Sequence, residues 1–243
     1  MAKEITKTTT KTITADPRLY AALDLPTIED ARALVADLGD SVVSYKIGLQ
    51  LIPIGGTEFG KELIAQGKNV FFDYKLHDIG ATVEKATRSL APMGADLLTV
   101  HGTPDVMAAA VRGRGHSRLK IMAVTVLTSL DDEALMEMGY FMKAEELVLH
   151  RVRQAIRAGV DGVISSPLEA EKIRAMVPKG FLVVTPGVRM PGGDKGDQKR
   201  VATPGSALQN GASHIVVGRP ISQANDPRAA VQAILANMHA LSV

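Results

Sequence analysis

The chain has 243 residues, of which 46% are hydrophobic and 22% are charged, and its formal net charge is +2, as is common for a soluble globular protein of one large domain or two small ones. It has no basic face with interleaved aromatic residues and no apolar run of the roughly 18 residues that a membrane span needs, which argues against nucleic acid and membranes as partners. The absence of cysteine excludes disulfides and thiolate metal sites and is compatible with a cytoplasmic location.

The first residues differ in character from the rest of the chain. Residues 1–15 are rich in threonine and lysine and have no apolar core, so we expect a flexible tail and no secretory signal. No low-complexity linker interrupts residues 16–243, which we therefore interpret as one domain.

Within this domain one unit recurs: a short run rich in valine, isoleucine and leucine, a loop, and a longer amphipathic stretch. The predicted strands are Leu19–Leu23, Val42–Ile47, Asn69–Phe72, Ala95–Val100, Lys120–Leu127, Gly162–Ser165, Phe181–Thr185 and His214–Val217. Helical patterns such as Ile28–Leu38 and Ala144–Ala158 lie between them. Several of these helices approach the next strand through glycines that suit a left-handed cap, namely Gly39, Gly94, Gly159 and Gly211.

The number of these units predicts the fold class. Strands that are apolar throughout and are separated by helices indicate a parallel sheet covered on both sides. Eight such units in about 230 residues favour a closed (β/α)8 barrel, an α/β fold, over an open doubly wound sheet.

One stretch combines a buried strand with several charges. The apolar run Asn69–Phe72 is followed by Asp73, Lys75 and Asp78, and a helical pattern begins near Ile79. Side chains two apart in a strand share a face, so we expect Asp73 and Lys75 to point the same way. A strand-end salt bridge would explain this pair alone, but opposite charges packed where a buried strand ends are costly unless they are paired or used.

Polar residues follow most of the other predicted strands as well. In a barrel these positions form one rim, where the functional residues of this fold gather. They are Asp24, Lys46, His101, Thr128 with Ser129, Arg189 and Arg219.

The last two strand ends predict a phosphate site. Gly218 permits close backbone approach, and the guanidinium of Arg219 suits phosphate oxygens. The Gly-rich segment 192–198 is typical of a loop that closes over a ligand. Barrels often bind a phosphate after strands 7 and 8, whereas no P-loop or dinucleotide fingerprint is present.

The charges themselves suggest a reaction class. Nearby carboxylates favour the ammonium form of Lys75, which makes it a proton donor rather than a Schiff-base nucleophile. A carboxylate beside a substrate carboxylate would repel it, and a lysine could stabilise and protonate the carbanion left by departing CO2. The residues alone therefore predict decarboxylation or proton transfer on a phosphorylated, anionic substrate.

The order Asp73-x-Lys75-x-x-Asp78-Ile79 resembles the signature of the orotidine 5'-phosphate decarboxylase family. The resemblance extends from about Leu19 to Leu235. It includes the segments Ala22-Leu23-Asp24, Tyr45-Lys46-Ile47-Gly48, Val124 to Ser129, Asp161-Gly162-Val163, Val184 to Arg189, Gly196-Asp197-Gln198 and Val217 to Pro220.

The resemblance implies a role for each matching residue. Lys75 would protonate C6 of the pyrimidine inside a charge network with Lys46, Asp73 and Asp78, and Asp78 would reach the partner's site. The remaining substrate-binding positions would be Asp24 and Lys46 at the ribose, Thr128 and Ser129 near the base, Arg189, Gln198, Gly218 and Arg219 at the phosphate, Pro186 in the segment before Arg189, and Ile79 and Thr82 across a homodimer interface.

The resemblance also implies orotidine 5'-phosphate as substrate, UMP as product, no cofactor and no metal. Two alternatives stay open. Mg²⁺-dependent sugar-phosphate decarboxylases or synthases of the same barrel group resemble one another in having an acidic metal ligand where this chain has Lys46. A catalytically silent nucleotide-binding barrel is the second alternative. One departure from the family pattern is the segment Thr103-Pro104-Asp105 after the fourth strand.

Overall fold

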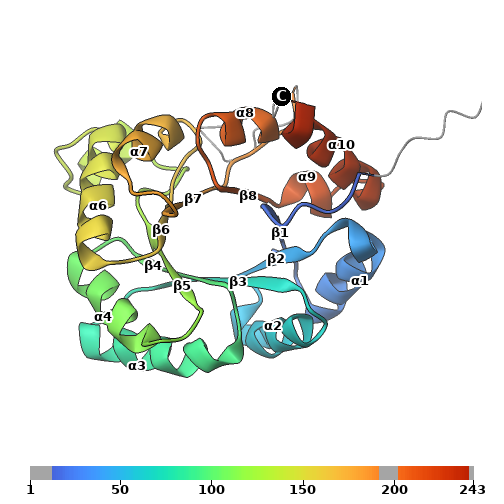
Figure 1. Cartoon of the computed structure of the whole chain (residues 1–243), viewed down its shortest axis with the longest axis horizontal. Coiled ribbons are helices and arrows are strands. Elements are labelled where there is room, and N and C mark those ends of the chain that lie inside the picture. Colours follow the sequence, from blue (N-terminus) through green and yellow to red (C-terminus); the bar gives the residue numbers. More distant parts are fainter. Residues whose placement is uncertain (1–12, 192–201, 241–243) are drawn as a thin grey trace, which may run out of the picture.

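The computed structural model describes residues 13–191 and 202–240. These residues form a closed barrel of parallel strands in the order β1 to β8, in which β8 pairs with β1 (Figure 1). The strands are β1 (Leu19–Ala22), β2 (Ser44–Gly48), β3 (Asn69–Leu76), β4 (Leu97–His101), β5 (Lys120–Val124), β6 (Gly162–Ile164), β7 (Leu182–Thr185) and β8 (His214–Val217). The predicted (β/α)8 fold is confirmed.

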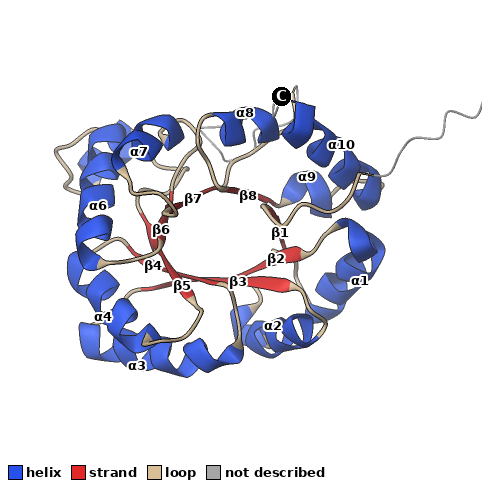
Figure 2. Cartoon of the chain, viewed as in Figure 1, coloured by secondary structure: helices blue, strands red, loops and turns tan. Residues whose placement is uncertain are grey.

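Helices surround the barrel as an outer layer (Figure 2). They are α1 (Ile28–Leu38), α2 (Gly56–Ala65), α3 (Gly80–Leu90), α4 (Pro104–Arg114), α5 (Asp132–Glu137), α6 (Ala144–Ala158), α7 (Ala170–Met176), α8 (Pro204–Gln209), α9 (Arg219–Ser222) and α10 (Pro227–Ala240), with short 3₁₀ helices at Gly39–Ser41, Ile52–Ile54 and Ala91–Met93. Within the described ranges, no helix has the length and apolar character needed to cross a membrane.

Two apolar cores explain why the strands are hydrophobic on both faces. The larger core fills the space between the barrel and the helices, where the alternate strand residues Phe72 and Tyr74 pack with ring centroids 4.9 Å apart. The smaller core lies inside the barrel, where Tyr20 and Phe71 meet edge to face at 5.6 Å. Side chains therefore fill the barrel interior below the rim, as is usual for this fold.

Most predicted boundaries agree with the structure, and α1 and α6 have the predicted bounds. Two strand predictions are wrong at their carboxyl ends. The third strand continues to Leu76 instead of ending at Phe72, because the charged residues after Phe72 still belong to the sheet. The fifth ends at Val124 instead of Leu127, although the amide and the hydroxyl of Thr125 still donate to the carbonyl of Ile164. The other strand limits differ by at most two residues.

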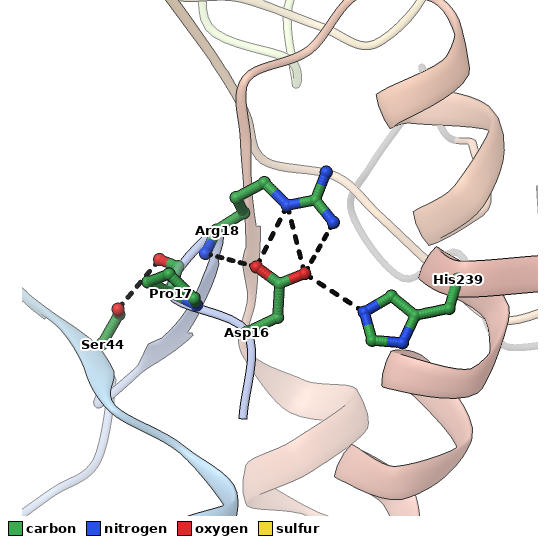
Figure 3. Close-up of polar contacts among 5 residues, drawn as sticks. All are labelled: Asp16, Pro17, Arg18, Ser44 and His239. Atoms are coloured by element: carbon green, nitrogen blue, oxygen red, sulfur yellow. Dashed lines mark hydrogen bonds and ion pairs between the residues drawn. The ribbon is translucent and has the colours of Figure 1, made fainter. Parts of the chain in front are cut away.

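A group of polar contacts joins the start of the described chain to its last helix (Figure 3). The carboxylate of Asp16 accepts hydrogen bonds from the backbone and side chain of Arg18, and its Oδ2 lies 3.3 Å from Nε2 of His239 on α10. Ile13 and Gln232 of α10 exchange two further hydrogen bonds. We call the Asp16–Arg18–His239 group the clasp; it lies at the amino end of the barrel, away from the predicted rim.

Candidate active site

A cavity of about 530 Å³ opens at the carboxyl ends of the strands. It is lined by residues from several strand ends, so side chains far apart in the sequence face one space. The predicted site residues that line it are Asp24, Lys46, Asp73, Lys75, Thr128, Pro186, Arg189, Gly218 and Arg219.

Lysines and carboxylates alternate along one side of this cavity. Nζ of Lys46 lies 3.0 Å from Oδ1 of Asp24 and 3.3 Å from Oδ2 of Asp73. The same Oδ2 of Asp73 lies 2.8 Å from Nζ of Lys75. The structure thus brings together four charges in the order Asp24, Lys46, Asp73, Lys75, and each inner charge has an opposite charge on both sides.

Burial and neighbouring charges act in opposite directions on the inner pair. Burial lowers the pKa of Lys46, but the charges of Asp73 and Asp24 outweigh it and hold that pKa above its usual value. Burial raises the pKa of Asp73, but Lys46, Lys75 and a hydrogen bond from Thr99 outweigh it and hold that pKa below its usual value. Both groups therefore remain ionised at neutral pH.

Local backbone features make room for this arrangement. Gly48 ends β2 beside the first ion pair, and a Cβ there would lie 2.7 Å from Oδ1 of Asp24 and 2.9 Å from Nζ of Lys46. Any side chain at this position would displace one of the two charged groups.

The backbone of β3 is irregular at the charged residues. Phe72 pairs with Leu98 and Leu76 pairs with Val100, so β3 has two more residues than β4 across this stretch. Among the described residues, Lys75 is the one non-glycine residue with positive φ, at 48°. This conformation costs on the order of 1–3 kcal/mol and persists where surrounding contacts hold it, which occurs most often at functional sites.

A second group of cations comes from the other half of the barrel. Arg189 follows β7 and Arg219 follows β8, and both line the cavity together with Gly218. The backbone of Arg189 is fixed by a hydrogen bond from its amide to the carbonyl of Ala202, on the far side of segment 192–201. Gln198, which the sequence assigns to the same phosphate site, lies outside the described residues.

Four predicted site residues do not line the cavity of this single chain. Ser129 is exposed beside the buried Thr128. Asp78 and Thr82 are also exposed, and Ile79 leaves 71% of its surface in solvent. Asp78 and Ile79 lie between β3 and α3, and Thr82 lies in the first turn of α3.

Sequence reasoning missed Thr99, which is fully buried on β4. Its hydroxyl donates to Oδ1 of Asp73 at 2.9 Å and accepts the amide N–H of Lys75 at 3.0 Å. A hydroxyl residue inside the run Leu97-Leu98-Thr99-Val100 was the available signal, but threonine is also a good strand former. The cavity-lining residues Gln50, Ser165 and Gln223 were missed as well.

The described residues contain no group of three or more His, Cys, Asp or Glu side chains arranged to hold a metal ion. The acidic residues Asp24 and Asp73 instead share the ammonium of Lys46.

Comparison with known proteins gives consistent results at three levels. A family model described as "Orotidine 5'-phosphate decarboxylase / HUMPS family" matches residues 17–234. The orotidine 5'-phosphate decarboxylase of Caulobacter vibrioides is 56% identical over 230 residues, which cover 93% of this chain and 99% of the relative. That of Nitrobacter winogradskyi is 51% identical over 224 residues, 92% of this chain and 93% of the relative.

A solved structure also resembles the barrel. The crystal structure of orotidine 5'-phosphate decarboxylase from Lactobacillus acidophilus aligns with a TM-score of 0.79 and 37% identity. The alignment covers 93% of this chain and 99% of the other.

Proposed function

The chain belongs to the orotidine 5'-phosphate decarboxylase / HUMPS family, and on this basis we propose that it is a carboxy-lyase that converts orotidine 5'-phosphate to UMP and CO2, a step of pyrimidine biosynthesis. The observation that carries the proposal is the alternating array of Asp24, Lys46, Asp73 and Lys75 in a cavity that is also lined by Arg189 and Arg219. This is the charge distribution that an anionic, phosphorylated substrate requires.

The arginines and the carboxylates fix the orientation of the substrate. The guanidinium groups of Arg189 and Arg219 bind the phosphate, and the backbone at Gly218 approaches it closely. Asp24 and Lys46 bind the ribose hydroxyls, while Thr128 contacts the base and Pro186 lines the same cavity. Gln198 completes the phosphate grip. These contacts hold the pyrimidine with its carboxylate toward Asp73 and Lys75.

The chemical step uses the charge network. As the bond between C6 and the carboxylate breaks, CO2 departs and the electron pair stays on C6. Asp73, held ionised by its lysine neighbours, disfavours the substrate carboxylate, and the ammonium of Lys75 stabilises the developing carbanion. Lys75 then transfers a proton from Nζ to C6 and regains one from solvent.

The site is completed in a homodimer. Asp78 of one protomer extends the charge network of the other, and Ile79 and Thr82 pack at the same interface. The exposure of all three residues in the single chain supports this assignment. The location in the cell is expected to be the cytoplasm, as the cysteine-free composition suggests.

The direct test is the loss of ultraviolet absorbance when orotidine 5'-phosphate is added to the purified protein. Steady turnover to UMP is expected, and no change at micromolar enzyme would refute the function. Binding of UMP without turnover would instead identify a silent nucleotide-binding barrel.

The role of Lys75 has its own test. Lys75→Ala should lower kcat by at least about 10³-fold, because it removes both the proton donor and the cation beside the carbanion. The matched control is Lys172→Ala, which removes an exposed lysine paired with Glu145 and should leave kcat unchanged. Near-full activity in Lys75→Ala, with folding confirmed by circular dichroism, would refute the assigned role.

A further inference from the structure

Thr99 lies behind the charge network and connects its two reacting members. It sits on β4, next to the irregular part of β3, and no part of it is exposed. Its hydroxyl is 2.9 Å from Oδ1 of Asp73 and 3.0 Å from the backbone nitrogen of Lys75. One oxygen atom thus contacts the side chain of one residue and the backbone of the other.

The direction of both hydrogen bonds follows from the chemistry of the groups. An ionised carboxylate only accepts, and a backbone N–H only donates. The single hydroxyl proton of Thr99 must therefore point to Asp73, and an oxygen lone pair must receive the N–H of Lys75. Only a residue that donates and accepts at one atom can satisfy both partners, and in this space serine is the conservative substitute.

The bond to Asp73 fixes the rotation of its carboxylate. With Oδ1 held by Thr99, Oδ2 is turned toward Nζ of Lys75 at 2.8 Å and Nζ of Lys46 at 3.3 Å. If the carboxylate were free to rotate, its charge would no longer stay between the two ammonium groups.

The bond to Lys75 holds a backbone that would otherwise relax. Lys75 has a φ of 48°, within the stretch where β3 and β4 lose their regular pairing. A regular ladder partner is absent at this point of the register, and Thr99 supplies the acceptor for the Lys75 amide in its place. The direction in which the Lys75 side chain leaves the strand therefore depends on Thr99.

We propose that Thr99 is a positioning residue for the reaction, which sets the orientation of Asp73 and Lys75 through one hydroxyl without touching the substrate. The inference rests on the proposed decarboxylase function. It predicts an effect on the chemical step and little effect on binding, because Arg189 and Arg219, which grip the phosphate, follow β7 and β8, and these strands do not pair with β3 or β4.

The test compares Thr99→Val, Thr99→Ser and one control variant in steady-state kinetics with orotidine 5'-phosphate. Thr99→Val keeps the shape and removes the hydroxyl, and kcat should fall by about 10- to 100-fold while KM stays within about threefold. Thr99→Ser keeps the hydroxyl and should restore kcat to within about fivefold of the unmodified protein.

The matched control is Thr87→Val on α3. Thr87 is also fully buried, and its hydroxyl has no hydrogen-bond partner among the described residues. Its substitution reproduces the chemical change without touching the charge network, so kcat and KM should remain those of the unmodified protein.

Each outcome supports or overturns the inference. Unchanged kcat in Thr99→Val, or a rise in KM with no change in kcat, would refute the positioning role. The same loss in Thr99→Ser as in Thr99→Val would show that shape matters and the hydroxyl does not. If Thr99→Val does not fold, Thr99→Cys replaces it, because the thiol is of similar size and a far weaker donor. Absence of turnover in the unmodified protein would refute the proposed function instead.

Discussion

Among single residues, His214 shows that the amino end of the barrel also holds a perturbed ionisable group. It begins β8, packs 5.9 Å from the ring of Tyr20, and contacts the hydroxyl of Ser213 through Nδ1. Burial, together with the positive charges of Lys120 and Arg18, lowers its pKa from 6.5 to about 4. The folded protein therefore keeps this imidazole neutral under conditions in which an exposed histidine is charged.

This shift predicts a pH dependence of stability. Below pH 6.5 the unfolded chain takes up a proton at His214 before the folded state does, so stability falls as the pH drops from 6.5 to about 4 and then levels off. Between pH 7.5 and 4.5 the contribution of His214 to the free energy of unfolding should fall by about 2 kcal/mol.

Urea unfolding at the two pH values measures the effect. His214→Asn should lose this part of the pH dependence, whereas His150→Asn, at an exposed position of α6, should retain it. Identical pH dependence in the unmodified protein and His214→Asn would contradict the expectation.

Among the elements, β3 shows where sequence patterns succeed and where they fail. The apolar run to Phe72 and the spacing of Asp73 and Lys75 predicted a buried strand with two charges on one face, and the 2.8 Å contact between them agrees. The extension of β3 to Leu76 was not predictable from the sequence. Charged residues after an apolar run normally indicate that a strand has ended, and only the structure shows that these ones continue the strand at the rim of the cavity.

The same limit applies to side chains that act across strands. Local patterns identify Lys75, but its acceptor Thr99 lies 24 positions away on the next strand and resembles an ordinary strand residue. Thr99 meets the Lys75 amide because β3 has two more residues than β4 between the pairs Phe72–Leu98 and Leu76–Val100. No pattern within either strand encodes it.

The contact between α3 and α4 offers a test at this scale. Gly113 of α4 faces the backbone of α3, and a Cβ there would collide with the carbonyl of Glu84 and lie 2.8 Å from Cβ of Thr87. Gly113→Ala should lower the free energy of unfolding by about 2 kcal/mol, because the two helices must separate to admit the methyl group.

Denaturant unfolding again provides the measurement. Gly80→Ala is the control, since its added Cβ would make an ordinary contact of 3.6 Å with Ala109 and should not destabilise the protein. Equal stability of the two variants would show that α3 and α4 are less tightly packed than the structure indicates.

At the scale of the whole molecule, the homodimer that we propose would complete the active site with residues of a second chain. The sequence predicted the rim residues that one chain brings together, but Asp78, Ile79 and Thr82 lie outside the cavity of that chain. A single chain leaves their role as a proposal, because a partner surface is not encoded in the local geometry of one protomer.

Mixing two inactive variants tests that role. Each proposed site combines Lys75 of one chain with Asp78 of the other. In a heterodimer of Lys75→Ala and Asp78→Ala chains, one site therefore lacks both residues and the other has both. Random pairing in co-expressed protein should therefore restore about a quarter of the unmodified activity. Each variant expressed alone is the control. Activity no higher than that of the separate variants would contradict a site shared between protomers.

The pairing of β8 with β1 has a consequence for biosynthesis. The seam joins Leu19 to Ile215, so it forms only after β8 has left the ribosome. The contacts beside it are also long-range, since Ile13 bonds to Gln232 and Asp16 contacts His239. Until then β1 presents an open edge of the kind that pairs with other chains. Long-range closure is also slow, because the loop entropy is lost before the contacts form. The clasp at Asp16 and His239 therefore lies where the nascent chain is exposed for longest, and its formation marks the end of that exposure.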